Sequence, residues 1–266
     1  MQESVQARDS SAYRALLIDI DGTVIAGRRV LPGAPELLQL ARKDGRRFVF
    51  LSNNSFAWPA ETAATLTGLG LACEEGEVIS AGHLAAERAA ERSKRGIFVL
   101  GSQSLVDMVT HAGGNVTEDG PDVVLVGLDR GLTYPRLSIA CRALLGGAKV
   151  VAVNRDWTVP TDIGLEPGIG VLLSALRAYK PMRPLICGKP SPVLAHAAQQ
   201  RLGAELDEML MIGDSLDVDM RMAHRAGIAG AVIKTGVVAS KAVEREVRAT
   251  YTFCDLPALL AWMRAG

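Results

Sequence analysis

The chain alternates short apolar runs with longer segments in which apolar residues recur at helical spacing. Several runs are apolar throughout, which is typical of strands covered on both faces. The predicted strands are 15–18, 48–51, 97–100, 123–126, 150–153, 185–187, 209–212 and 231–233. The predicted helices are 32–45, 59–68, 84–94, 134–145, 169–179, 193–202, 216–226 and 238–248. This alternation predicts an α/β fold of parallel sheets with right-handed crossovers.

Four of the predicted strands end in polar residues. Asp19 and Asp21 end the first, Ser52-Asn53-Asn54 follows the second, Gly188-Lys189-Pro190 follows the run at 185–187, and Gly213-Asp214 ends the run at 209–212. In open parallel sheets, ligands bind beyond the carboxyl ends of the strands. We therefore expect these four ends to converge on one chemical site.

The pair Asp19 and Asp21 carries the strongest local signal. Side chains alternate along a strand, so these two carboxylates share one face. Two close carboxylates repel each other unless a cation or a shared proton is present. The pair therefore predicts a metal site, acid–base chemistry or both; the alternative is a surface turn, since Asp-Gly is an ordinary turn former.

Together the four ends hold the groups that phosphoryl transfer needs. Asp19 is a candidate nucleophile toward phosphorus, and Asp21 is a candidate to protonate the leaving oxygen and later deprotonate water. Asp214 adds a hard oxygen ligand, and carboxylates with a backbone carbonyl and water suit Mg²⁺. Ser52 offers a hydroxyl and a backbone N–H to phosphate oxygens, and Lys189 offsets negative charge.

Each residue also has a plain structural interpretation. The Ser52-Asn53 pair could cap a helix or turn, Asp214 could be a helix N-cap, and Lys189 could be a solvated loop lysine. Asp217 and Asp219 could be first-turn acids favoured by the helix dipole. Their order along the chain and their joint placement at strand ends favour the catalytic interpretation.

Composition narrows the function classes. Of 266 residues, 48% are hydrophobic and 22% charged, which is ordinary globular usage. Lys+Arg and Asp+Glu both number 29, so the zero net charge argues against a broad nucleic-acid surface. The four cysteines are scattered, which predicts reduced thiols in a cytoplasmic protein. We expect no membrane partner, because no apolar stretch approaches about 18 residues, and no secretory signal, because the first eleven residues are polar.

Four motifs in order resemble one known family. They are Asp19-Ile20-Asp21-Gly22-Thr23, Ser52-Asn53-Asn54-Ser55, Gly188-Lys189-Pro190 and the run from Gly213 to Asp219. The chain resembles the haloacid dehalogenase (HAD) superfamily, in its NagD-like or p-nitrophenylphosphatase-like branch (subfamily IIA). The likeness spans about residues 14–235.

The resemblance implies a Rossmann-like catalytic core with an inserted α/β cap domain. The core would comprise residues 12–80 and 186–266, and the cap, residues 81–185, would select the substrate. The implied activity is a Mg²⁺-dependent phosphatase that forms an aspartyl-phosphate on a small phosphorylated metabolite, such as a nucleotide, a sugar phosphate or phosphoglycolate. A homodimer through the cap is an option that the resemblance leaves open.

The resemblance also assigns roles to residues. Asp19 is the nucleophile and Asp21 the general acid/base; the Asp19 carboxylate, the Asp21 backbone carbonyl and Asp214 hold Mg²⁺. Asp219 orients the metal site or Lys189 from outside.

The resemblance also assigns phosphate binding to Ser52 and Asn53, and charge neutralisation to Lys189. It gives Asp217 no role.

The predicted cap offers weaker signals. The segment Asn154-Arg155-Asp156-Trp157 and the stretch 164–170 are candidate contacts to the substrate. Arg155 could meet an anionic group and Trp157 could stack on a ring, but a lone tryptophan more often packs and a lone arginine is more often solvated.

Three other functions remain to be separated from the phosphatase. A phosphomutase would keep its phospho-enzyme from water, and halide removal would need no metal. A catalytically inactive sensor of phosphorylated ligands would have lost a chemical group, whereas Asp19, Asp21, Ser52, Lys189 and Asp214 are all present. Phosphate release from p-nitrophenyl phosphate, with and without chelator, separates a hydrolase from a sensor.

Overall fold

The computed structural model describes residues 7–161, 163–235 and 241–266. The chain divides into two compact units, each built from separated stretches of sequence. The first unit comprises Met1–Ser52, Pro59–Ile79 and Lys189–Gly266, and the second comprises Asn53–Trp58 and Ser80–Gly188.

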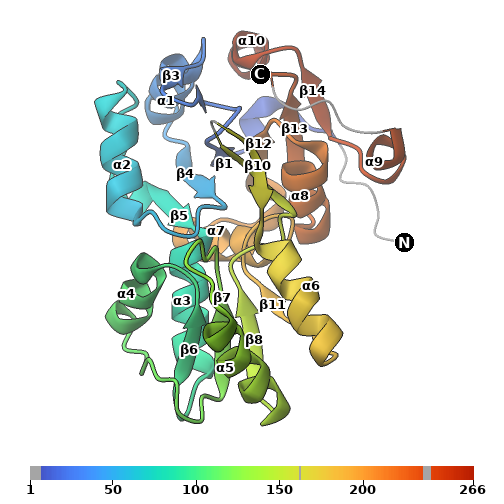
Figure 1. Ribbon diagram of the computed structural model, residues 1–266. Coiled ribbons are helices and arrows are strands. Elements are labelled where there is room, and N and C mark those ends of the chain that lie inside the picture. Colours follow the sequence, from blue (N-terminus) through green and yellow to red (C-terminus); the bar gives the residue numbers. More distant parts are fainter. Residues whose placement is uncertain (1–6, 162, 236–240) are drawn as a thin grey trace. The chain divides into compact units, whose positions relative to one another are not determined.

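The described residues of the first unit centre on a six-stranded sheet (Figure 1). The central strand β1 (Ala15–Asp19) is buried along its whole length and pairs in parallel with strands on both sides. In order across the sheet, the strands are β14 (Tyr251–Phe253), β13 (Ala229–Ile233), β12 (Met209–Gly213), β1, β4 (Arg47–Ser52) and β5 (Val78–Ser80).

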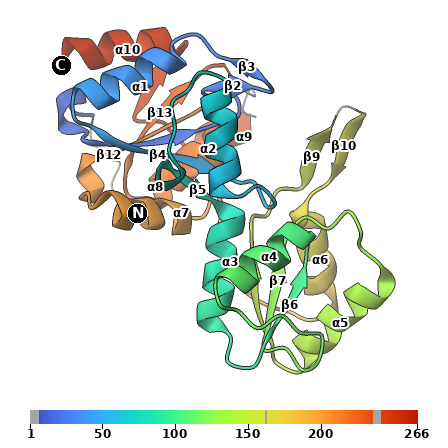
Figure 2. The same ribbon diagram turned by 90° about the vertical axis from the view of Figure 1, so that its left-hand side faces the viewer.

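Helices cover both faces of this sheet, which explains why its central strands are apolar throughout (Figure 2). Leu16 and Ile18 of β1 belong to the core that α1 (Ala34–Lys43) and α10 (Leu256–Ala265) close. The other face carries α7 (Val193–Leu202) and α8 (Arg221–Ala226). The remaining elements are the hairpin β2 (Ile25–Ala26) and β3 (Arg29–Val30), α2 (Pro59–Gly68), α9 (Lys241–Glu246) and the short turns η1 (Ser10–Ala12), η2 (Glu75–Glu77) and η3 (Leu206–Glu208).

The second unit has its own parallel sheet and its own helices. In its described part the strand order is β11 (Leu185–Ile186), β8 (Lys149–Ala152), β7 (Val123–Val126) and β6 (Ile97–Leu100). The helices α3 (Ala81–Arg92) and α4 (Gln103–His111) pack on one face, and α5 (Tyr134–Leu145) and α6 (Ile169–Tyr179) on the other (Figure 2). Between β8 and α6 the chain forms an antiparallel hairpin of β9 (Thr158–Thr161) and β10 (Gly164–Pro167).

The predicted parallel α/β class is confirmed, and all eight predicted strands are present. The strand that precedes Lys189 is not in the same sheet as the strands that precede the other three motifs. This strand, β11, belongs to the sheet of the second unit, so Lys189 does not follow a strand of the six-stranded sheet. Residues 53–58, 80 and 186–188 also belong to the second compact unit, whereas the sequence analysis grouped them with the core.

The predicted helix 216–226 begins with a π-helical turn, η4 (Leu216–Met220), before α8. Of the predicted helix 238–248, residues 238–240 lie outside the described residues. Among the described helices, none combines the length and apolar character needed to cross a bilayer.

Candidate active site

Three of the predicted strand ends meet at one edge of the six-stranded sheet. In the parallel registers, Ile18 lies opposite Ile212 and Asp19 lies opposite Leu51, so β1, β12 and β4 end at the same level. Asp19 therefore lies beside Ser52 at the end of β4 and Asp214 just after β12. Parallel pairing explains why the first, second and fourth motifs converge.

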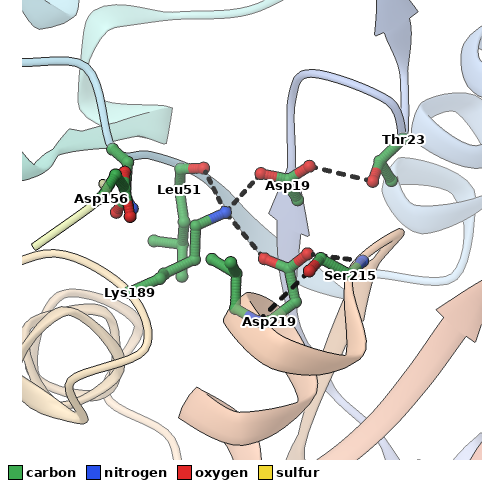
Figure 3. Close-up of polar contacts among 9 residues, drawn as sticks. Asp19, Thr23, Leu51, Asp156, Lys189, Ser215 and Asp219 are labelled. Carbon is green, nitrogen blue, oxygen red and sulfur yellow. Dashed lines mark hydrogen bonds and ion pairs between the residues drawn. The ribbon is translucent and has the colours of Figure 1, made fainter. Parts of the chain in front are cut away.

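Lys189 lies at the centre of the site, on the chain that returns to the first unit (Figure 3). Its Nζ donates to the Asp19 carboxylate, to Asp219 Oδ1 at 2.8 Å and to the Leu51 carbonyl oxygen at 3.4 Å. The side chain is only 3% exposed. Burial lowers the pKa of Lys189, but the charges of Asp19 and Asp219 outweigh burial and raise the pKa above its ordinary value. The lysine is therefore held as an ammonium ion.

Asp19 is oriented through both carboxylate oxygens. Oδ1 accepts from Lys189, and Oδ2 accepts from the Thr23 hydroxyl at 3.0 Å. Burial raises the pKa of Asp19 to about 6, with the charge of Lys189 opposing and that of Asp219 adding to the shift. A buried carboxylate fixed by two donors is well placed to act as a nucleophile.

Asp214 completes a cluster of carboxylates with Asp19 and Asp219. One carboxylate oxygen from each lies within 4.8 Å of the others. Burial raises the pKa of Asp214 to about 7, and the charges of Asp19 and Asp219 add to that effect. In the part of the chain that the structure describes, its carboxylate has no hydrogen bond to another residue.

A glycine makes the close approach to Asp214 possible. Gly22, in the turn after β1, has φ +87° and lies so close to the Asp214 carboxylate that an added Cβ would collide with it. Such a φ is unfavourable for other residues. The Gly22 carbonyl oxygen accepts from the Thr235 hydroxyl at 2.7 Å, which ties this turn to the chain after β13.

Asp219 differs from Asp214 because both of its oxygens are already hydrogen-bonded. Oδ1 accepts from Lys189, and Oδ2 accepts from the Ser215 backbone N–H at 3.1 Å (Figure 3). The residue is 1% exposed and lies in the π-helical turn η4. This geometry places Asp219 as a partner of Lys189.

Asp21 and Asp217 lie on the exposed side of the site. Partial burial, followed by the charge of Asp19, raises the pKa of Asp21. Asp217 instead pairs with Arg221, whose Nε lies 2.7 Å from Asp217 Oδ1. The acid to which the sequence gave no role is thus part of a surface ion pair.

The remaining candidates belong to the second unit. The Asn53 side-chain amide donates to Asp156 Oδ2 at 3.3 Å, and the Asn154 amide donates to the Asn53 carbonyl oxygen at 3.1 Å. Asn154 is 7% exposed. Arg155 and Trp157 are exposed, and within the described ranges no polar partner is found for the Arg155 side chain.

Sequence reasoning gave no separate role to Thr23, Thr235 or Asp156. Thr23 was detectable, since it lies in the same turn as Asp19 and Asp21. Thr235 carried no such signal, because its partner is 213 residues away along the chain. Asp156 lies in the segment predicted to contact the substrate, but its contact with Asn53 was not predicted, because the two residues are 103 positions apart.

The cluster fits a hard divalent cation. All side-chain donors are carboxylate oxygens, the ligands that such cations prefer. Three carboxylates face one ammonium, so the site carries excess negative charge. Burial is the main cause of the raised pKa values of Asp19 and Asp214, and the charges of neighbouring carboxylates add to it.

Comparisons with known proteins agree with this geometry. A family model described as haloacid dehalogenase-like hydrolase matches residues 16–115, and a second HAD-hydrolase-like model matches residues 186–259. An acid sugar phosphatase from Staphylococcus saprophyticus is 32% identical over 92% of this chain and 95% of its own length. A 5′-nucleotidase from Bacillus subtilis is 30% identical over 85% of this chain and 88% of its own length.

Solved structures show the same architecture. The 4-nitrophenylphosphatase of Thermotoga maritima superposes with a TM-score of 0.87 at 30% identity, covering 95% of this chain and 98% of that one. NagD from Escherichia coli, at 24% identity, shares the fold with a TM-score of 0.83. With the four motifs that meet around Asp19 and Lys189, these matches establish that the chain belongs to the haloacid dehalogenase superfamily of hydrolases, in its NagD-like phosphatase branch.

Proposed function

We propose that this enzyme is a Mg²⁺-dependent phosphomonoester hydrolase that acts through an aspartyl-phosphate on Asp19. The observation that carries the proposal is the buried contact between the Asp19 carboxylate and the Lys189 ammonium, beside the carboxylates of Asp214 and Asp219. Positive charge next to the nucleophile allows an anionic carboxylate to approach an anionic phosphoester.

In the first half-reaction, a carboxylate oxygen of Asp19 forms a bond to phosphorus while the ester P–O bond breaks. Asp21 gives its proton to the leaving oxygen. The raised pKa of Asp21 supports this role, because it favours the protonated form that a general acid needs. Lys189 and the phosphate-binding residues Ser52 and Asn53 hold the transferring group.

In the second half-reaction, a water oxygen bonds to phosphorus and Asp21 takes the proton from that water. The bond between Asp19 and phosphorus then breaks, which releases inorganic phosphate and restores the carboxylate. Before the transfer, Thr23 and Lys189 hold the Asp19 carboxylate through both of its oxygens, which supports the in-line approach that this step needs.

The Asp19 and Asp214 carboxylates, with the Asp21 backbone carbonyl, would hold Mg²⁺. When bound, Mg²⁺ would supply a positive charge that neutralises the phosphoryl oxygens and orients the ester. Asp219 would orient Lys189, since both of its oxygens are already bonded.

The second unit, including residues 81–185, would act as the cap that selects a small phosphorylated metabolite. The curated relatives are named for sugar phosphates and nucleotides, which makes these two classes the first to test. The exposed Arg155 and Trp157 supply a charge and a ring for that selection.

The test is hydrolysis of p-nitrophenyl phosphate with added Mg²⁺, repeated with excess EDTA, followed by a panel of sugar phosphates and nucleotides. We expect phosphate release that stops with EDTA and returns with Mg²⁺. Brief incubation with ³²P-labelled substrate and acid quenching should trap label on the wild type and none on Asp19→Asn. Absence of hydrolysis across the whole panel would support a sensor instead, and transfer of label to a second sugar hydroxyl would support a mutase.

A further inference from the structure

Asp156 lies in the turn after β8, in the same unit as Asn53. Its Oδ2 accepts from Asn53 Nδ2 at 3.3 Å, and its backbone N–H donates to Asn154 Oδ1 at 3.1 Å. Asn154 Nδ2 in turn donates to the Asn53 carbonyl oxygen at 3.1 Å. These three bonds close a ring in which both the backbone and the side chain of Asn53 are held.

The opposite side of the Asn53 side chain is also confined. Gly188 lies so close to Asn53 Oδ1 that an added Cβ would come within 2.6 Å of that oxygen. The Gly188 backbone N–H donates to the Val153 carbonyl oxygen at 2.6 Å, which fixes its position at the end of β8. The Asn53 carboxamide therefore lies with its nitrogen toward Asp156 and its oxygen toward Gly188.

Asp156 is itself fixed by the beginning of α6. Gly170 N–H donates to the Asp156 carbonyl oxygen at 2.9 Å, and a Cβ at Gly168 would collide with that same oxygen. The backbone of Asp156 is thus held from two sides, so its carboxylate is a fixed acceptor. A carboxylate accepts a stronger hydrogen bond than a neutral group would.

We propose that Asp156, braced by Asn154, is a positioning residue that orients Asn53 for binding the transferring phosphoryl group. This inference rests on the proposed function and names a part of its machinery that no motif role covers. Asn53 directly follows Ser52, so the phosphate-binding segment passes from the end of β4 straight into the ring. Without Asp156, the Asn53 side chain must be ordered at each turnover, and misplacement of a positioning group by about 1 Å can cost up to 100-fold in rate.

The test compares Asp156→Ala, Asp156→Asn and Asp122→Asn in the full-length, Mg²⁺-loaded protein. It measures kcat and KM for p-nitrophenyl phosphate, and the Kd of inorganic phosphate by calorimetry. We expect Asp156→Ala to lower kcat/KM by roughly 10–100-fold and to weaken phosphate binding. Asp156→Asn should recover part of both losses, because its amide oxygen can still accept from Asn53.

Asp122→Asn is the matched control, since it makes the same chemical change in the same unit. Asp122 accepts hydrogen bonds from the Ser93–Gly96 segment and has no contact with the ring. It should reduce thermal stability yet leave kcat/KM and phosphate affinity at 25 °C unchanged. If Asp122→Asn lowers activity as much as Asp156→Ala, the effect of Asp156 is general loosening of the unit and the inference is wrong.

A double-mutant cycle tests whether Asp156 acts through Asn53. In an Asn53→Ala background, Asp156→Ala should cost nothing further in kcat/KM or phosphate affinity, because the group it orients has gone. Fully additive losses would overturn the inference. If the wild-type enzyme hydrolyses phosphoesters and Asp156→Ala is unaffected, this inference alone is rejected. If the wild type is inactive but binds phosphate, and Asp156→Ala weakens that binding, the proposed hydrolysis alone is rejected.

Discussion

Within the described residues, Lys189 contacts two carboxylates and leaves a third beside them without a hydrogen bond from its ammonium. Its ammonium group pairs with Asp19 and Asp219, whereas Asp214 gains no hydrogen bond from it among the described contacts. A buried ammonium between two carboxylates is stable when its hydrogen bonds are complete, as they are here with the Leu51 carbonyl oxygen as third acceptor. Asp214 is therefore the carboxylate of the cluster that has no hydrogen bond to another described residue, which leaves its oxygens open to a cation.

Replacing Asp19 by Asn should abolish turnover and leave the fold intact, because the change removes the nucleophilic charge and hardly alters shape. We expect at least a ~10³-fold loss of kcat with p-nitrophenyl phosphate and an unchanged circular dichroism spectrum. More than a few per cent of wild-type activity in the purified variant would contradict the nucleophile assignment.

Replacing Asp214 by Asn should separate metal binding from folding. We expect the Mg²⁺-induced rise in Tm to disappear and activity to fall by at least ~10²-fold. The Tm of the metal-free variant should not decrease, because one of three mutually repelling carboxylates is neutralised.

Asp217→Asn provides the control for Asp214→Asn. Asp217 is an exposed acid three residues further along the chain and pairs with Arg221. Exposed ion pairs contribute about 0–1 kcal/mol, so this variant should keep its Mg²⁺ response and its activity. A Mg²⁺ response that survives in Asp214→Asn and vanishes in Asp217→Asn would reverse the assignment.

At the scale of elements, the turn after β1 and the π-helical turn η4 bring the acids together. Gly22 allows the first turn to pass against Asp214, and Gly213, at the end of β12, leaves room for the Asp219 carboxylate. Each of these glycines lies where an added Cβ would collide with a site carboxylate. Backbone conformation at the strand ends is thus part of the chemistry.

Gly22→Ala and Gly27→Ala form a matched pair that tests this point. Both glycines have positive φ in the same turn and hairpin region, +87° and +61°, but an added Cβ meets the Asp214 carboxylate at Gly22 and nothing within 4 Å at Gly27. Gly27→Ala should cost about 1 kcal/mol of stability and keep activity. Gly22→Ala should also weaken the Mg²⁺ response and lower kcat; equal kinetics in the two variants would show that the approach to Asp214 is unimportant.

The sequence predicted most elements with strong periodicity but missed α4, β14 and α10. The bounds of α5, α6 and α7 match the prediction, because each has a full helical period of apolar residues. The strand β14 is three residues long, and its Tyr251 and Phe253 rings pack against Trp262 of α10. β14 was not predicted, because so short a strand has no readable period and its partner is close only in the fold. The prediction also missed α10, although its buried Leu256, Leu259, Leu260 and Met263 recur at helical spacing.

At the scale of the whole molecule, the chain builds two compact units with separate sheets. In the second unit, Asp122 holds the segment before β6. Its carboxylate accepts from the Ser93 hydroxyl and from the backbone N–H groups of Lys94, Arg95 and Gly96. Burial raises the pKa of Asp122, but these hydrogen bonds outweigh burial and hold the pKa well below its ordinary range.

Asp122→Asn should therefore destabilise the second unit in a pH-dependent way. The native pKa is lower than the unfolded value of about 3.9, so the stabilisation is complete above that value and is lost as pH falls toward the native pKa. At pH 7 the variant should lose about 1–3 kcal/mol, and the difference from wild type should shrink below about pH 4.

Hydrogen exchange of backbone amides shows which unit Asp122→Asn destabilises. Amides of β6 and β7 should exchange faster in Asp122→Asn, whereas those of β1 and β12, in the other unit, should keep their protection. Equal acceleration in both units would show that they unfold as one.

The sequence by itself determined the α/β class, the positions of the main strands and the four motifs that form the candidate site, because apolar periodicity and local turn signals are written in neighbouring residues. Only the tertiary structure decided that Lys189 reaches Asp19 from outside the six-stranded sheet, that Asp219 bonds Lys189 while Asp217 faces Arg221, and that Asp156 holds Asn53. These contacts depend on the order of the strands in the sheet, on the π-helical turn η4, and on the close approach of side chains to the backbone at glycines. None of these is encoded in the spacing of residues along the chain.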